Sequence, residues 1–238
     1  MWKICAKLVL KNLSVEQKAN RLEICQDLLG RLEIEPNFLH KVITGYETWV
    51  FDYDPEPNGK VRNGTRKFLL IQRKHAWADP AWKQWLLLFF DSHGIVHKEF
   101  VPSGQTVNHA FYKDVLERLR KRVQRVRNDI ADDWVLQHDN ALVHTALSIR
   151  EFLAKKNIPV LPHPPYSPDL TPCDFYLFPK LKSKLKGHHF GTMENIQKIV
   201  TDELNTLTKN DFQYCYDKWK KRNHCVTSQG SYFEGDNL

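Results

Sequence analysis

The stretch QWLLLFFDSHGIVHKEFV, residues 84–101, decides the fold. Two largely apolar runs, 84–91 and 94–101, flank a short polar turn, DSHG, at 91–94. Apolar runs of this length on either side of a turn are typical of an antiparallel β-hairpin. We therefore expect two neighbouring antiparallel strands at this point.

A strand and a helix are predicted upstream of the hairpin. The block VITGYETWVFDYD, residues 42–54, is rich in β-branched and aromatic residues and predicts a strand. Residues 14–32 place apolar side chains at helical spacing, and Ser14 with Gln17 has the pattern of a capping box. Residues 54–84 are polar and basic, then Trp-rich without a regular period, so we expect a long loop or insertion there.

Helices and short strands alternate downstream of the hairpin. The apolar periodicity predicts a helix at 107–126, capped by Thr106, and another at 147–156. Short strands are expected at 134–139 and 158–161.

Helical segments complete the chain. We expect them at 173–186, where Pro179 predicts a kink or break, at 193–207 and at 210–224. The order of elements predicts an α/β fold with a mixed five-stranded sheet flanked by helices and followed by C-terminal helices. Its first strands are expected to be antiparallel and its later strands parallel.

Composition limits the classes of function. The 238 residues are 42 % hydrophobic, which is enough for one sizeable folded domain. A net charge of +7 favours a polyanionic partner such as DNA. The five cysteines lack the spacing of a zinc or redox motif, and no apolar run approaches the roughly 18 residues that span a bilayer. We therefore expect a protein of the nucleus or cytosol with no membrane partner.

Two aspartates are candidate metal ligands. Phosphoryl transfer on DNA uses divalent ions, which carboxylate oxygens hold well. Asp139 ends a predicted strand and is followed by Asn140 and His144, whereas Asp174 follows a proline-dense stretch at the start of a predicted helix. Taken alone, Asp139 fits a turn cap equally well, and Asp174 fits an acid placed by the helix dipole.

The text around the two aspartates resembles the mariner-type transposases of the Tc1/mariner superfamily. HDNALVHTA (138–146) and IPVLPHPPYSPDLTPCDFYLFPKLKSKLKG (158–187) are similar to the second and third acidic motifs of that family, whose aspartates are also separated by thirty-four residues. LSVEQKANRLEICQDLL (13–29) and FLHKVITGYETWVFDYDPE (38–56) resemble its linker helix and first catalytic strand. The resemblance covers nearly the whole chain apart from about 60–84.

The resemblance implies an RNase H-like fold and a chemistry of DNA strand cleavage and transfer. In this family three carboxylates hold two Mg²⁺ or Mn²⁺ ions, and Asp139 and Asp174 match two of the three positions. The first aspartate belongs to a Thr-Gly-Asp-Glu motif, whereas this chain has TGYE at residues 44–47. Tyr46 thus stands in place of the first catalytic aspartate.

A tyrosine at this position weakens a two-metal site on chemical grounds. A phenol with a pKa near 10 stays neutral at physiological pH and is a weak ligand. Glu47 should point to the opposite face of the strand, and Asp52 shares the face of Tyr46 but lies about 20 Å further along it. Asp91 is expected to be a residue of the hairpin turn. We therefore expect weakened or lost metal binding, and weak or absent cleavage.

Neighbouring polar residues and two basic runs complete the candidate site. Asn140 and His144 are candidates to orient groups near the metals, with ordinary satisfied polar residues as the alternative. Basic runs can contact DNA phosphates, although they are equally common on solvated helix faces. The candidate DNA-binding residues are Arg118, Lys121, Arg122, Arg125, Lys180, Lys182, Lys184 and Lys186.

The resemblance also implies a domain organisation. We expect a linker helix region at 1–38, a catalytic domain at 39–190 that contains the 54–84 insertion, and a helical extension of the same domain at 191–238. Active relatives carry paired helix-turn-helix modules ahead of the linker, and nothing in this sequence corresponds to them. An N-terminally truncated chain of this kind should bind DNA mostly without sequence specificity.

Three interpretations of function stay open, and the least favoured is an unrelated nuclease that uses Asp139 and Asp174 with a different partner acid. The first is a degenerate transposase catalytic domain, nuclear, acting on DNA either as a homodimer or paired with an intact transposase. The second is a non-catalytic module, derived from a transposon, that binds DNA or interacts with a transposase.

Overall fold

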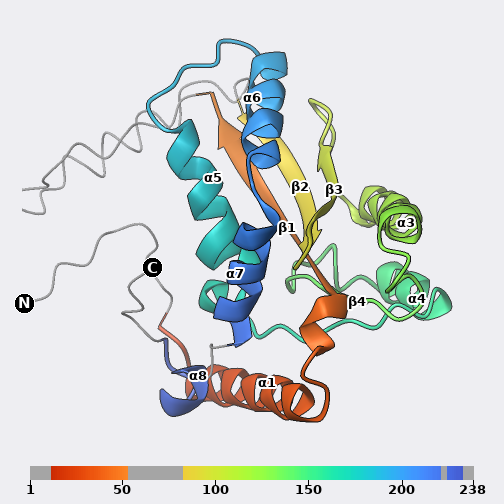
Figure 1. Cartoon of the computed structure of the whole chain (residues 1–238), viewed down its shortest axis with the longest axis vertical. Coiled ribbons are helices and arrows are strands. Elements are labelled where there is room, and N and C mark those ends of the chain that lie inside the picture. Colours follow the sequence, from red (N-terminus) through yellow and green to blue (C-terminus); the bar gives the residue numbers. More distant parts are fainter. Residues whose placement is uncertain (1–11, 53–82, 221–223, 233–238) are drawn as a thin grey trace, which may run out of the picture.

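Four strands form one mixed sheet in the computed structural model, which describes residues 12–52, 83–220 and 224–232 (Figure 1). The strands are β1 (Val42–Phe51), β2 (Lys83–Asp91), β3 (Gly94–Phe100) and β4 (Val135–Gln137), and their spatial order is β3-β2-β1-β4. β1 pairs antiparallel with β2, and β2 with β3, while β4 lies parallel to β1. The predicted hairpin, first strand and mixed sheet are therefore confirmed.

The fifth strand predicted at 158–161 is reduced to one parallel bridge, between Leu136 and Val160. The Leu136 N–H donates to the Pro159 carbonyl over 2.9 Å. Pro159 and Pro162 carry no N–H, so this segment has few donors with which to extend a ladder. The α/β class and the RNase H-like arrangement stand, with four strands instead of five.

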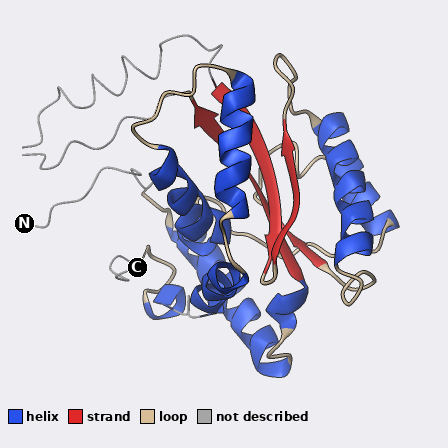
Figure 2. Ribbon diagram, turned by 45° about the horizontal axis from the view of Figure 1, so that its top comes forward, coloured by secondary structure: helices blue, strands red, loops and turns tan. Residues whose placement is uncertain are grey.

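Helices cover both faces of the sheet, as Figure 2 shows. α3 (His109–Val126) and α4 (Leu147–Lys155) pack on one face. The helices on the other face are α5 (Phe178–Leu185), α6 (Met193–Asn205) and α7 (Lys209–Lys220). Within the described ranges, no helix has the combination of length and apolar character needed to cross a membrane.

β2 contributes to both hydrophobic cores because successive side chains of a strand point to opposite faces. Leu86, Leu88 and Phe90 join the core beneath α5, α6 and α7. Leu87 and Phe89 join the core beneath α3 and α4. This central strand is therefore buried on both sides, which explains its nearly continuous apolar sequence.

α1 (Val15–Ile34) begins with the predicted capping box. The Gln17 N–H donates to the Ser14 hydroxyl over 3.2 Å, and the Ser14 N–H donates to the Gln17 side chain over 3.0 Å. α1 packs against the short helix α8 (His224–Thr227), and Figure 1 shows the two side by side, so the two ends of the described chain meet below the sheet.

The start of α3 differs from the prediction. Asn108, and not Thr106, caps this helix: its side-chain oxygen accepts a hydrogen bond from the Phe111 N–H over 2.9 Å. A capping side chain must stand immediately before the first helical residue, and in this chain that residue is His109.

The helix predicted at 173–186 is continuous through Pro179, but its winding changes just before that residue. A π-helical turn, Cys173–Leu177, precedes α5, and Pro179 lies in the first turn of α5. A π turn of this kind is a common way for a helix to accommodate a proline that cannot donate a backbone hydrogen bond. The predicted insertion at 54–84 lies outside the described residues except at its end, where Lys83 and Gln84 already belong to β2.

A substitution at Gly45 would test how tightly the centre of the sheet is packed. It lies opposite Phe89, and a Cβ atom at position 45 would stand 2.3 Å from two carbons of that ring. We expect Gly45→Ala to lower the free energy of unfolding by about 1–3 kcal/mol, the usual cost of overpacking, as measured by urea denaturation.

Gly30→Ala is the matched control for this substitution. Gly30 lies in α1 with no neighbouring heavy atom within 4 Å of the added carbon. The same change should therefore raise stability by about 0.5–1 kcal/mol, because alanine favours the helix. A Gly45→Ala variant as stable as the parent would contradict the packing described for β1 and β2.

Candidate active site

Three separate elements bring Tyr46, Asp139 and Asp174 together. Tyr46 comes from the middle of β1, Asp139 follows the end of β4, and Asp174 lies in the π-helical turn before α5. Burial raises the pKa of the Tyr46 phenol above its ordinary value, and the charges of Asp139 and Asp174 raise it further. Tyr46 is therefore a neutral phenol that faces two carboxylates.

The carboxylate of Asp174 is destabilised where it lies. Burial raises the pKa of Asp174, the negative charge of Asp139 adds to the effect, and together they bring it to about 6. The positive charge of Lys182 acts in the opposite direction without offsetting them. The two aspartates therefore form a like-charged pair that is only partly neutralised.

His144 joins Asp139 to Glu47. Its Nδ1 lies 2.7 Å from Asp139 Oδ1, and its Nε2 lies 2.9 Å from Glu47 Oε1. Burial lowers the pKa of His144, but the hydrogen bonds and charges of the two carboxylates outweigh burial and raise it to about 9. The ring is therefore an imidazolium that donates to both carboxylates at neutral pH.

The imidazolium in turn holds Asp139 ionised. Burial raises the pKa of Asp139, but the hydrogen bond and charge of His144 outweigh it and leave the pKa below its ordinary value. The same oxygen, Oδ1, also accepts the Ala141 N–H over 2.9 Å. One oxygen of Asp139 is thus already occupied by two donors of the protein.

A buried aromatic stack supports His144. The rings of His138 and His144 are parallel within 8° with centroids 4.9 Å apart, and the Tyr112 ring of α3 lies 4.1 Å from that of His144. Burial and the charge of His144 lower the pKa of His138 to about 3, so His138 is neutral. The Tyr112 hydroxyl lies 2.9 Å from His138 Nδ1. These contacts fix the His144 ring between its two carboxylates.

The remaining acids near β1 and β2 are engaged elsewhere. Glu47 faces the α3 side of the sheet and reaches Asp139 only through His144. Asp52 accepts the Phe190 and Gly191 N–H groups, and Asp91 accepts N–H groups of its own hairpin turn. Among the residues that the structure describes, no three His, Cys, Asp or Glu side chains are grouped so that they could hold a metal ion.

The proline-rich loop before Asp174 supplies polar neighbours that the sequence did not single out. The Thr171 hydroxyl donates weakly to the Tyr46 oxygen over 3.5 Å and lies 3.3 Å from His163 Nε2. The His163 ring meets the Tyr46 ring edge to face, with centroids 6.4 Å apart. Asn140, a predicted neighbour of the site, donates to the His163 carbonyl and so ties the end of β4 to this loop.

The basic residues predicted on α3 line one groove. This groove has a volume of about 700 Å³ and runs beside the edge strand β3, and its basic lining residues are His97, Lys98, Arg118, Lys121, Arg122 and Arg125. Arg118 is held by Glu99 through two hydrogen bonds, whereas Lys121 and Arg125 are exposed. Because α3 rises about 1.5 Å per residue, this basic stretch begins roughly 9 Å from Tyr112 along the helix.

The lysines predicted to bind DNA on and after α5 have different partners in the structure. Lys180 forms an ion pair with Asp211, and Lys184 forms one with Glu203 over 2.8 Å. Lys182 differs, because its charge lowers the pKa of Asp174. Of these three lysines, only Lys182 affects the charge of the candidate site.

Comparisons with known proteins agree with this geometry. The family described as DDE superfamily endonuclease matches residues 52–197. The Mariner Mos1 transposase of Drosophila mauritiana is 31 % identical over 230 residues, which cover 93 % of this chain and 64 % of the relative. The human histone-lysine N-methyltransferase SETMAR is 28 % identical over 240 residues, which cover 96 % of this chain and 33 % of the relative. The chain thus spans less than two thirds of either relative.

Solved structures give the same result. The catalytic domain of Mos1 mariner transposase superimposes with a TM-score of 0.79 at 30 % identity, covering 95 % of this chain and all of that one. A Mos1 paired-end complex with Mn superimposes with a TM-score of 0.82 at 29 % identity, covering 98 % of this chain and 68 % of that one. The similarity therefore extends over nearly all of this chain.

Asp174→Asn tests the like-charged pair through its pH dependence. The pKa of Asp174 is raised from 3.8 to about 6 in the folded chain, so the folded state holds this proton more tightly than the unfolded state. Stability is therefore lost as the pH rises from about 4 through 6. We expect the variant to match the parent near pH 4 and to exceed it by about 1–2 kcal/mol near pH 7.5, by urea denaturation.

Asp129→Asn, at an exposed aspartate between α3 and β4, is the control. It should leave the difference from the parent independent of pH. A pH-independent difference for Asp174→Asn as well would show that Asp174 is not destabilised by its surroundings.

Proposed function

We propose that this chain, which belongs to the DDE superfamily of endonucleases and has the catalytic domain of a mariner transposase, binds DNA but has lost two-metal strand cleavage and transfer. The observation that carries this proposal is Tyr46, a half-buried neutral phenol on which the charges of both Asp139 and Asp174 act. Its place on β1 matches the first aspartate of the family motif. The catalytic fold is thus kept, while one of its three acids is missing.

The residues present do not fit a pair of divalent ions. Mos1 structures have been solved with Mg and with Mn. In this chain, Asp139 and Asp174 supply two negative charges, against the four positive charges of two such ions. One oxygen of Asp139 is already held by His144 and the Ala141 N–H. A neutral phenol adds no charge, so the site lacks the negative charge that two divalent ions need.

Glu47 does not replace the missing acid. Its carboxylate lies on the α3 side of β1 and forms an ion pair with His144. To bind a cation beside Asp174 it would have to leave the buried imidazolium and pass to the other face of its strand. Side chains of a strand alternate between faces, so this needs a shift of register.

DNA binding is supported by the distribution of positive charge. The chain carries a net charge of +7, and the groove along α3 gathers Lys121, Arg122 and Arg125. Mos1 has been solved as a paired-end complex with the left transposon end. We infer that the α3 groove contacts the phosphate backbone, which supplies affinity without reading bases.

Tyr46→Asp restores the third carboxylate and should restore metal binding. With a dissociation constant near 1 mM, about 10 mM Mn²⁺ would stabilise the variant by about 1.4 kcal/mol and raise its melting temperature by roughly 3–6 °C. The parent chain should show no such shift. In a plasmid nicking assay, the parent should show no Mn²⁺-dependent cleavage above that of Asp139→Ala.

Tyr46→Asn is the control, because it removes the phenol without adding a charge, and it should not respond to Mn²⁺. Manganese-dependent nicking by the parent that disappears in Asp139→Ala would overturn the loss of cleavage. An unchanged melting temperature of Tyr46→Asp in Mn²⁺ would show that the three positions do not form a metal pocket.

Removing two exposed cations of the α3 groove should weaken DNA binding at every sequence tested. We expect the double variant Lys121→Ala/Arg125→Ala to bind a duplex roughly tenfold more weakly at about 50 mM salt. A plot of the logarithm of the association constant against the logarithm of the salt concentration has a negative slope. This slope should become shallower by about 2, because each lost phosphate contact removes about 0.9 from its magnitude. Fluorescence anisotropy over a salt series measures both quantities.

Lys198→Ala/Lys209→Ala is the matched control, since it removes two exposed charges from α6 and α7. An equal loss of affinity in the two double variants would mean that net charge, and not the α3 groove, governs binding.

A further inference from the structure

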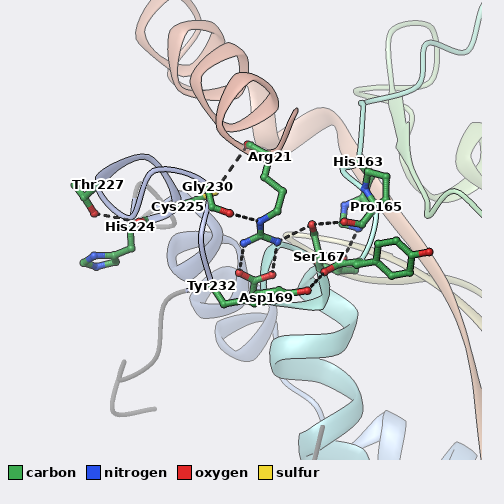
Figure 3. A network of polar contacts seen from close by, with 12 residues as sticks. Arg21, His163, Pro165, Ser167, Asp169, His224, Cys225, Thr227, Gly230 and Tyr232 are labelled. Carbon is green, nitrogen blue, oxygen red and sulfur yellow. Dashed lines mark hydrogen bonds and ion pairs between the residues drawn. The ribbon is translucent and has the colours of Figure 1, made fainter. Parts of the chain in front are cut away.

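Arg21, in α1, is fully buried and forms the centre of the polar network in Figure 3. Its guanidinium donates two hydrogen bonds to Asp169, over 2.8 and 2.6 Å, and one to the Ser167 hydroxyl over 2.6 Å. Its Nε donates to the Gly230 carbonyl over 2.9 Å, and the Tyr232 ring stacks 4.7 Å from it. One side chain thus joins α1 to two distant segments.

The first segment is the proline-rich loop that leads into the candidate active site. Ser167 and Asp169 belong to the loop 162–172, which contains five prolines and therefore few backbone N–H donors. Arg21 supplies donors that this loop cannot supply for itself. The loop is not held by backbone hydrogen bonds to a neighbouring strand, and the Arg21 side chain fixes it instead.

The loop passes this constraint on to the site. The Thr171 hydroxyl lies 3.4 Å from the Ser167 carbonyl and 3.5 Å from the Tyr46 oxygen. The Asp174 N–H donates to the Thr171 carbonyl over 3.0 Å. A continuous series of contacts therefore runs from Arg21 through Ser167 and Thr171 to Tyr46 and Asp174.

The second segment is the C-terminal end of the described chain. Gly230 has a φ of +73°, and a Cβ atom there would stand 2.0 Å from the Lys18 carbonyl oxygen, so only glycine allows this approach to α1. The Tyr232 hydroxyl donates to the Tyr166 carbonyl over 2.7 Å. Tyr166 has a φ of 55°, which is unfavourable for a bulky residue. The C-terminal segment thus helps to hold the loop in a strained conformation.

We propose that Arg21 is a positioning residue for the candidate active site. It fixes the loop that carries Thr171 and leads to Asp174, so the placement of α1 and of the C-terminal segment controls the geometry around Tyr46. The inference rests on the proposed function only in treating Tyr46, Asp139 and Asp174 as one site.

The chemistry of the side chain suits this role. A guanidinium is planar and presents five donors in fixed directions, so it can bind a carboxylate with two parallel bonds and still serve a hydroxyl and a carbonyl. A lysine ammonium is a point charge that cannot reproduce this geometry. Arg21→Lys should therefore keep the charge in α1 but release Ser167 or Gly230.

The test places 3-fluorotyrosine at position 46 of the full chain and follows its ¹⁹F resonance. Arg21→Met and Arg21→Lys should both shift and broaden this resonance, because the loop around the phenol loses its anchor. In the Tyr46→Asp background, Arg21→Met should weaken Mn²⁺ binding roughly tenfold, as the loss of a supporting hydrogen bond commonly does. The fluorine measurement needs neither metal nor DNA, so it stays decisive if the proposed function fails.

Two controls separate positioning from general stability. Arg31→Met removes an exposed ion pair with Asp27 on the same helix, and Val115→Ala weakens the core on the far side of the sheet. Neither should move the fluorine resonance, although Val115→Ala lowers the melting temperature. If Arg21→Met also lowers the melting temperature but leaves the resonance unchanged, the proposal is overturned.

Ser167→Ala settles the question if the Arg21 variants do not fold. It removes the hydrogen bond from Arg21 and the loop's own bond from the Ser167 hydroxyl to the Pro165 carbonyl, and it leaves the Asp169 ion pair in place. A shifted fluorine resonance in this variant supports the proposal, whereas a resonance identical to that of the parent contradicts it.

Discussion

Negative charge gathered at the carboxyl end of β4 is the constraint that governs this site. Asp139 lies between two other acids, with Glu47 on one side through His144 and Asp174 on the other, in a partly buried region where like charges repel strongly. In this chain two protein groups relieve the repulsion. His144 is an imidazolium between Asp139 and Glu47, and Tyr46 brings a neutral phenol, with no charge of its own, toward Asp139 and Asp174. The cluster is thus compatible with a folded protein without bound cations, although the ionised form of Asp174 remains destabilised.

β1 serves both halves of the cluster because two successive residues point to opposite faces. Tyr46 faces Asp174 and the α5 side, whereas Glu47 faces His144 and the α3 side. The register of β1 against β2 fixes both directions at once, and Gly45 under the Phe89 ring holds that register by close packing. A slip of one residue would exchange the two faces and separate both groups from their partners.

Local patterns predicted the elements but not the contacts that complete the site. The composition of 42–54 and the two apolar runs of the hairpin were sufficient to predict β1, β2 and β3. The apolar side chains of these strands are the ones that are buried, so the sequence pattern follows the burial pattern. The segment 158–161 has the composition of a strand, yet its prolines leave too few donors for one. The contact of His144 with Glu47 joins residues 97 positions apart, and that of Arg21 with Ser167 joins residues 146 apart. Such pairings depend on the tertiary fold, so no spacing in the sequence indicates them.

The neutral phenol at position 46 also bears on the proposed binding of DNA. A cluster of three carboxylates without metal would repel a phosphodiester, and the repulsion would be strong in a partly buried site of low dielectric constant. A neutral phenol removes one of those charges, and His144 neutralises much of the charge on Asp139. The groove that carries Lys121 and Arg125 lies along β3, at the opposite edge of the sheet from β4, so it does not depend on metal bound beside Asp174. The neutral phenol thus fits both halves of the proposed function, because one fewer negative charge disfavours the binding of metal ions and makes metal-free DNA binding less unfavourable.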